Sequence, residues 1–139
     1  MKCLIVRPPF AKYIVDGIKT IEYRNRKTNI RGRIGIIEAG TSTIIGDVEL
    51  YDCTYNPDIY LWEWKLEAPN KYLYPVHFQH KKGAIIWEEL NWTPDISGRQ
   101  YEMPSMFNWY AYKEEEKCHK LEQKFIKEYV RRTYGLDGV

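Results

Sequence analysis

The sequence lacks any long apolar run, and this absence narrows the class of protein. No stretch approaches the roughly 18 consecutive apolar residues that a membrane-spanning helix needs. The amino terminus leads directly into a strand pattern and has none of the long apolar stretch of a signal peptide. We therefore expect a cytoplasmic protein that has no membrane partner.

Cysteine and histidine are also scarce, with three of each. Cys3, Cys53 and Cys118 lie far apart and form no C-x-x-C pair, which argues against a disulfide framework. His77 and His80 are three residues apart, but the proline before them and the lysines and glycine after them indicate a loop. We predict no metal site and no cofactor.

Motifs for nucleophilic catalysis and phosphate-cradling loops are missing as well. No serine stands in a G-x-S-x-G setting, and no glycine-rich phosphate loop occurs. Cys118 and His119 are neighbours in a predicted helix, where adjacent side chains diverge by about 100°. These two side chains are therefore not placed to react together.

The composition fits one globular domain with a single core. The chain has 139 residues, of which 44% are hydrophobic and 29% charged. Its charge is uneven: residues 1–34 hold nine basic and two acidic side chains, a net charge of +7, whereas the remaining 105 residues carry −5. A basic amino-terminal quarter is the footprint expected for a phosphate-bearing partner, although an ordinary solvated surface gives the same count.

Short strands separated by turns dominate the first two thirds of the chain. We predict strands at residues 2–6, 19–25, 33–39, 44–53, 60–67 and 83–90. Between the first two strands, Phe10, Ile14 and Ile18 recur at helical spacing and predict a helix that Gly17 ends. Gly46 predicts a bulge, or a bend at a barrel corner, within the fourth strand.

The rest of the chain completes the predicted fold. Residues 69–75 are expected to be irregular, and the aromatic residues 91–110 are expected to pack on the barrel. Apolar spacing predicts a second helix over residues 111–134. The fold class is therefore α+β: a small β-barrel of five to six strands with an early helix at residues 1–90, and a C-terminal helical extension at residues 91–139 packed on the same single domain.

The richest chemistry lies in the predicted strand at residues 19–25. Thr20, Glu22 and Arg24 share one face of this strand. Lys19 points the other way in an ideal strand, and joins them only if the preceding corner turns it inward. Lysine and arginine suit phosphate, and a glutamate can accept hydrogen bonds from a base or act as a general base. A structural ion pair on a barrel rim is the alternative.

The sequence around this strand resembles the ASCH domains. Residues 14–24 fit the run I-x-x-G-x-K-T-x-E-x-R, and residues 31–33 the R-G-R that follows it. Residues 60–69 and 83–87 resemble the later patterns Y-x-W-x-L-x-x-P and G-A-x-x-W, so the resemblance covers about residues 2–90. It implies a PUA-like β-barrel with a cleft beside the first helix, similar to RNA-binding and RNA-modification modules.

The resemblance also implies residue roles. Lys19, Glu22 and Arg24 match the lysine, acid and arginine of the family motif. Some members are reported to hydrolyse N4-acetylcytidine or to cleave RNA. In the small amidohydrolase members the motif reads K-T-x-T, with the second threonine as the proposed nucleophile. This chain has Glu22 at that position, a departure that argues against the hydrolase activity.

Three functions remain open at this point. The first is an RNA- or nucleotide-binding domain whose basic cleft beside the first helix engages single-stranded RNA, a nucleoside or a nucleotide. The second is an enzyme of the same cleft, a ribonuclease or nucleoside amidohydrolase with Lys19 and Glu22 as catalytic residues. The third is a protein-interaction domain in which the C-terminal helix or the segment at residues 91–110 docks a partner. The residues expected to bind nucleic acid are Arg7, Lys19, Thr20, Glu22, Arg24, Asn25, Arg26 and Lys27.

Overall fold

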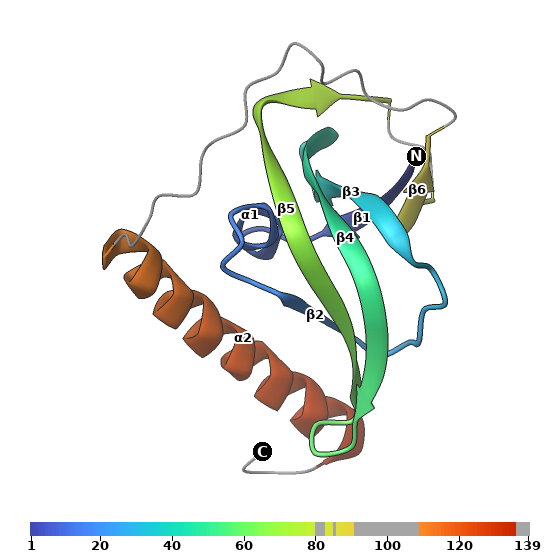
Figure 1. Cartoon of the computed structure of the whole chain (residues 1–139). Helices are drawn as coiled ribbons and strands as arrows, with labels where there is room; N and C mark the ends of the chain where they lie inside the picture. Colours follow the sequence, from blue (N-terminus) through green and yellow to red (C-terminus); the bar gives the residue numbers. More distant parts are fainter. Residues whose placement is uncertain (80–82, 85, 91–108, 136–139) are drawn as a thin grey trace.

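Six strands form one mixed sheet in the computed structural model, which describes residues 1–79, 83–84, 86–90 and 109–135 (Figure 1). The strands are β1 (Lys2–Val6), β2 (Ile21–Arg24), β3 (Gly32–Glu38), β4 (Thr43–Asn56), β5 (Leu61–His77) and β6 (Trp87–Glu89). Their order in the sheet is β2-β5-β4-β3-β1-β6. Only β1 and β3 pair in parallel; the other neighbours are antiparallel.

The sheet curls into a half-barrel, which confirms the predicted fold class. Trp64 of β5 stacks on Trp87 of β6, with ring centroids 5.6 Å apart and planes 14° from parallel. Three strands separate β5 from β6 in the sheet order, so this contact requires the sheet to curve strongly. Register shifts along β4 supply part of that curvature, because bulges bend a strand and increase its twist.

The first helix, α1 (Phe10–Val15), fills the curve of the sheet and forms the main core with it. Gly46 lies at one of the register shifts of β4, which confirms the bulge predicted there. A Cβ atom there would lie 2.4 Å from the backbone oxygen of Asn70 and 2.6 Å from Cγ1 of Val15. Only glycine therefore allows α1 and the two long strands to approach so closely.

The second helix, α2 (Trp109–Tyr134), confirms the predicted C-terminal helix and runs along the β2 edge of the sheet (Figure 1). Near its start, the hydroxyl of Tyr13 donates a hydrogen bond to Glu114 (3.3 Å). Near its end, Val130 is fully buried in a cluster with Leu61 of β5. The helix therefore extends from α1 at its start to the beginning of β5, next to the turn between β4 and β5, at its end.

Strand β5 runs longer than the sequence suggests. Residues 69–75, expected to be irregular, belong to β5, so this expectation is wrong. The pairing of β5 with β2 ends at Lys65. Beyond Lys65, the edge of β5 that faces β2 has no β2 residue to pair with. Neither Pro69 nor Pro75 is among the residues paired with β4. The prolines are tolerated because neither has to donate a hydrogen bond to a ladder.

Some expectations concern residues outside the described part of the chain. His80 and residues 91–108 lie outside it, so the predicted packing of the aromatic segment stays a prediction. Among the described residues, neither helix combines the length and the apolar character needed to cross a membrane.

All three cysteines are free and buried. Burial raises the pKa of the Cys3 thiol from about 9 to about 11, against the opposing effect of the amino-terminal charge. Because the folded-state pKa is the higher one, the unfolded chain ionises first as the pH rises. The stabilisation is complete below about pH 9 and is lost as the pH reaches about 11.

We therefore expect Cys3 to make the protein less stable between these pH values, by about 3 kcal/mol. Urea unfolding of the wild type and of Cys3→Ala, each at about pH 9 and about pH 11, isolates this contribution. All other titrating groups are present in both proteins, so the difference in their loss of stability is due to Cys3. Equal losses of stability in the two proteins would contradict the assignment to Cys3.

Candidate functional site

The corner between α1 and β2 turns Lys19 inward. Gly17 adopts a φ of +78°, which favours glycine, and the N–H groups of Ile18 and Lys19 both donate to the carbonyl oxygen of Tyr13 (2.9 and 3.0 Å). Lys19 is consequently only 4% exposed, and its Nζ lies 3.4 Å from Oε1 of Glu22. The condition under which Lys19 joins Glu22 and Arg24 is met.

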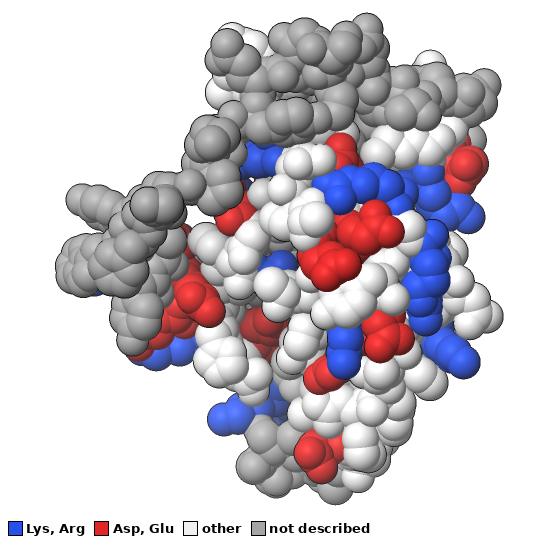
Figure 2. All heavy atoms as spheres, in the orientation of Figure 1, with Lys and Arg blue, Asp and Glu red and all other residues white. Residues whose placement is uncertain are grey.

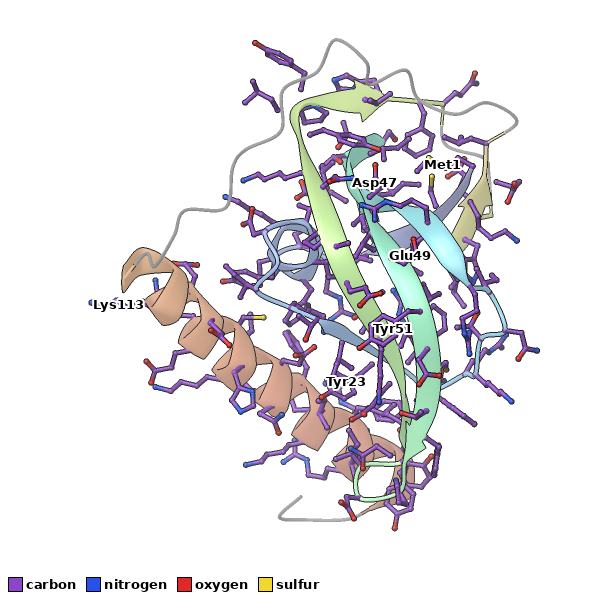
Figure 3. The ribbon with its side chains drawn as sticks, viewed as in Figure 1. Met1, Tyr23, Asp47, Glu49, Tyr51 and Lys113 are labelled. Atoms are coloured by element: carbon purple, nitrogen blue, oxygen red, sulfur yellow. The ribbon has the colours of Figure 1, made fainter. Side chains whose placement is uncertain are left out.

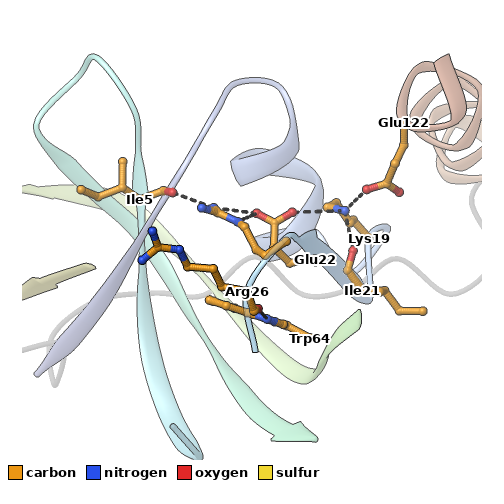
Figure 4. Close-up of polar contacts among 8 residues, drawn as sticks. Ile5, Lys19, Ile21, Glu22, Arg26, Trp64 and Glu122 are labelled. Carbon is orange, nitrogen blue, oxygen red and sulfur yellow. Dashed lines mark hydrogen bonds and ion pairs between the residues drawn. The ribbon is translucent and has the colours of Figure 1, made fainter. Parts of the chain in front are cut away.

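The Lys19 ammonium is surrounded by partners (Figure 4). It forms an ion pair with Glu122 of α2 and donates a hydrogen bond to the carbonyl oxygen of Ile21. It also lies 5.4 Å from the ring centroid of Phe10 and 5.3 Å from that of Tyr23. Desolvation by burial lowers the pKa of Lys19, and the carboxylate of Glu22 opposes this effect.

Arg24 lies on the other side of Glu22. Its Nη2 and Nε donate to Oε2 of Glu22, at 2.9 and 3.2 Å, so each oxygen of Glu22 contacts one cation. The same Nη2 donates to the carbonyl oxygen of Ile5 (2.9 Å). Since β1 and β2 are not neighbours in the sheet, Arg24 bridges the opening of the half-barrel. A lysine could not make this forked set of contacts.

A cavity of about 730 Å³ lies between the opening of the half-barrel and α2. Its lining combines charged, polar and aromatic side chains: Ile5, Val6, Arg7, Phe10, Glu22, Tyr23, Arg24, Asn25, Ala39, Leu61, Glu122, Phe125, Ile126, Glu128, Tyr129, Arg132 and Thr133. Three of these residues are arginines and three are glutamates. The charges of the lining therefore balance, in contrast to the basic cleft that the sequence led us to expect.

Four of the eight predicted binding residues line this cavity: Arg7, Glu22, Arg24 and Asn25. Lys19 is not among the lining residues, but it forms ion pairs with two of them, Glu22 and Glu122. The remaining three, Thr20, Arg26 and Lys27, are exposed and do not line the cavity. The structure thus gathers five of the eight predicted residues at the cavity and leaves the other three on the surface.

Helix α2 supplies lining residues that the sequence interpretation missed. Glu122, Phe125, Tyr129 and Arg132 follow one another at three- or four-residue spacing, which places them on one face of a helix. This periodicity is visible in the sequence. The periodicity does not reveal that this face closes a cavity, because no short-range sequence pattern shows that α2 packs near β2.

Part of the basic charge of residues 1–34 forms ion pairs within the protein. Lys19 and Arg24 pair with glutamates, and Arg33 pairs with Asp47 at 2.6 Å. Figure 2 shows acidic and basic side chains intermingled on the face of β4 and β5. Arg7 remains exposed at the cavity, with its guanidinium 5.4 Å from the ring centroid of Phe125.

The described residues contain no group of three or more histidine, cysteine, aspartate or glutamate side chains arranged to hold a metal ion.

Comparisons with known proteins identify the family. A model of the ASCH domain matches residues 4–132, a range that includes most of α2. Two crystal structures of single-substitution mutants of ZmASCH from Zymomonas mobilis share the fold. The first has a TM-score of 0.50 and 19% identity over 65% of this chain and 89% of its own. The second has a TM-score of 0.51 and 17% identity over 71% and 96%.

No curated protein matches this sequence closely enough to count as a relative. The family match spans nearly the whole chain, and the fold agrees with it. The chain belongs to the ASCH domain family.

Proposed function

We propose that this ASCH domain binds single-stranded RNA by holding one nucleotide in the cavity between the half-barrel and α2. The observation that carries the proposal is the cavity itself, which combines arginines with aromatic rings. Its volume of about 730 Å³ falls within the range typical of small-molecule sites. A free nucleoside or nucleotide would use the same contacts.

The chemistry of the lining suits the parts of a nucleotide. Guanidinium groups such as Arg7 and Arg132 bind phosphate oxygens in a bidentate manner. The rings of Phe125 and Tyr129 offer surfaces for stacking an unpaired base. The amide of Asn25 can donate to and accept from a base edge. Duplex RNA would bind less well, because its bases are not free to enter.

The other predicted residues take supporting places in this proposal. Lys19 holds Glu22, and Glu22 in turn holds Arg24 in a fixed orientation. Arg26 and Lys27 follow Asn25 on the surface and would contact phosphates of the strand as it leaves the cavity. Thr20 is exposed and would act at most at the periphery.

Binding fits the geometry better than catalysis does. In the enzymatic alternative Glu22 is the general base, yet each of its two oxygens already contacts a cation. A proton acceptor needs an oxygen directed at the substrate. Glu22 would first have to give up Lys19 or Arg24, and with it the bridge that Arg24 makes to β1.

Replacing Arg7 tests the proposal. We expect Arg7→Gln to weaken the binding of short labelled single-stranded RNA about tenfold, because a charge-assisted contact to phosphate is lost. Fluorescence anisotropy across a salt series measures this. Arg31→Gln is the matched control: Arg31 is exposed, hydrogen-bonds only carbonyl groups of its own loop among the contacts seen, and does not line the cavity.

Equal affinities of the two variants would place RNA elsewhere on the molecule. If the wild type binds neither single-stranded nor duplex RNA at low salt, the RNA proposal fails and the ligand is to be sought among free nucleosides.

A further inference from the structure

Helix α2 carries a continuous line of basic side chains on its exposed side. The line consists of Lys113, Lys117, Lys120, Lys124, Lys127 and Arg131, here called the basic stripe. All six residues are exposed. The spacing alternates between four and three residues from one end to the other, which keeps every member on one side of the helix.

The basic stripe contains charge of one sign only. With about 100° of rotation per residue, its members fall within a sector about 80° wide, and no other residue between Lys113 and Arg131 falls in that sector. With about 1.5 Å of rise per residue the stripe is about 27 Å long. An ordinary solvated helix face mixes lysine with glutamate, so an unmixed sector of this length is a distinct feature.

The basic stripe faces away from the cavity. The residues of α2 that meet the barrel, among them Glu122, Ile126 and Tyr129, lie on the opposite side of the helix. Figure 3 shows the two directions: Tyr23 lies between the barrel and α2, whereas Lys113 points outward from the start of the helix. A ligand of the stripe would therefore not compete for space with a ligand of the cavity.

Acidic neighbours neutralise the basic stripe only in part. Lys117 and Lys120 pair with Glu114 and Glu116, at 3.2 and 3.0 Å, within the same helix. Such exposed pairs contribute little and exchange readily with other anions. Among the described residues, the carboxy-terminal half of the stripe makes no ion pair: Lys124, Lys127 and Arg131.

We propose that the basic stripe is a second RNA-binding surface, which contacts the phosphate backbone of the strand whose nucleotide occupies the cavity. This inference rests on the proposed function, and extends it from one nucleotide to a longer strand. Successive charges of the stripe are about 4.5 to 6 Å apart along the axis, so they form a linear array. A phosphate backbone is the linear polyanion that complements such an array, and binding releases its counterions.

Two other partners fit the basic stripe less well. An anionic membrane binds amphipathic helices that insert apolar side chains, and the sector has none to insert. The core of a protein interface is depleted in lysine, whereas the stripe is five-sixths lysine. The vesicle measurement in the test decides the membrane alternative.

The test compares Lys124→Gln/Lys127→Gln with the charge-matched Lys12→Gln/Arg31→Gln, whose residues are exposed elsewhere. Glutamine keeps the helix propensity of lysine, so both variants are expected to fold. Affinity for a single-stranded RNA long enough to reach the stripe from the cavity is measured by anisotropy at several salt concentrations. A mononucleotide and anionic phospholipid vesicles serve as further probes.

We expect the stripe variant to bind the long RNA about tenfold more weakly at physiological salt, two contacts being lost. Its plot of log affinity against log salt should be shallower by about 1.4, since each phosphate contact on a single strand contributes about 0.7. Mononucleotide binding should be unchanged. The control variant should match the wild type in all three respects.

The outcomes separate this inference from the proposed function. If Arg7→Gln weakens RNA binding but the stripe variant keeps the wild-type slope, the stripe proposal is wrong and the cavity proposal stands. If the stripe variant loses affinity and Arg7→Gln does not, RNA binds the stripe and the cavity proposal is wrong. Loss of vesicle binding alone in the stripe variant would identify a lipid surface and overturn the RNA assignment.

Discussion

Replacing Lys19 by methionine is expected to destabilise the protein by about 3–5 kcal/mol, the usual cost of removing one partner of a buried ion pair. The ammonium of Lys19 is buried between Glu22 and Glu122. Methionine preserves the length and volume of the side chain but leaves the two carboxylates without their shared cation. Urea unfolding followed by circular dichroism should show a lower midpoint with an unchanged m-value.

Two further variants make this result specific. Lys12→Met changes an exposed lysine of α1 and should shift the midpoint very little. Glu22 keeps its contact with Arg24 in Lys19→Met, so adding Glu122→Gln removes the carboxylate charge that has lost its cation, and the double variant should be more stable than Lys19→Met alone. If Lys19→Met costs no more than Lys12→Met, the Lys19 ammonium is not buried between carboxylates in solution. If Glu122→Gln gives no recovery, α2 does not hold Lys19.

The order of the elements could be predicted because it depends on local signals. Alternation, helical spacing and turn residues located the six strands and both helices, although several ends differ. The first helix, for example, ends at Val15 and not at Gly17. Prolines misled the interpretation of residues 69–75, because the sequence does not reveal which edge of a strand lacks a partner. Pairing is a property of the whole sheet.

The candidate site could be predicted only in its local part. Glu22 and Arg24 are two residues apart on one strand, and Gly17 marked the corner that turns Lys19 toward them. Glu122 is 103 residues from Lys19 in the sequence, and no short-range pattern connects the two. The balance of charge at the cavity was missed for the same reason, since two of its three lining glutamates, Glu122 and Glu128, come from α2.

Helix α2 has two opposite sides with different roles. Its inner side closes the cavity and provides Glu122 to Lys19. Its outer side carries the basic stripe, whose spacing can be followed in the sequence once the structure shows which side is buried. The net charge of −5 beyond residue 34 hides this stripe, because acids elsewhere in the chain outnumber it. Local placement of charge, and not the regional sum, determines what a surface can bind.

The second large effect is expected from Gly46→Val, which tests the packing that supports this site. A Cβ at position 46 would meet the backbone oxygen of Asn70 at 2.4 Å and Cγ1 of Val15 at 2.6 Å. A backbone oxygen cannot rotate away as a side chain can, so β5 or α1 must shift. We expect a loss of about 3 kcal/mol, at the upper end of the usual cost of overpacking, measured by urea unfolding.

A double-mutant cycle shows whether this loss arises from contact with α1. Gly46→Ala introduces only the Cβ, and Val15→Ala removes the methyl group that this Cβ would meet. If the two side chains clash, the double variant should be more stable than the sum of the single effects predicts, by about 1 kcal/mol. Strict additivity would assign the whole cost to the Asn70 oxygen, and a stable Gly46→Val would refute the close packing. Because α1 leads directly into the corner that turns Lys19 inward, a shift of α1 should also weaken the proposed binding of RNA in the cavity, which would link the core of the fold to the site.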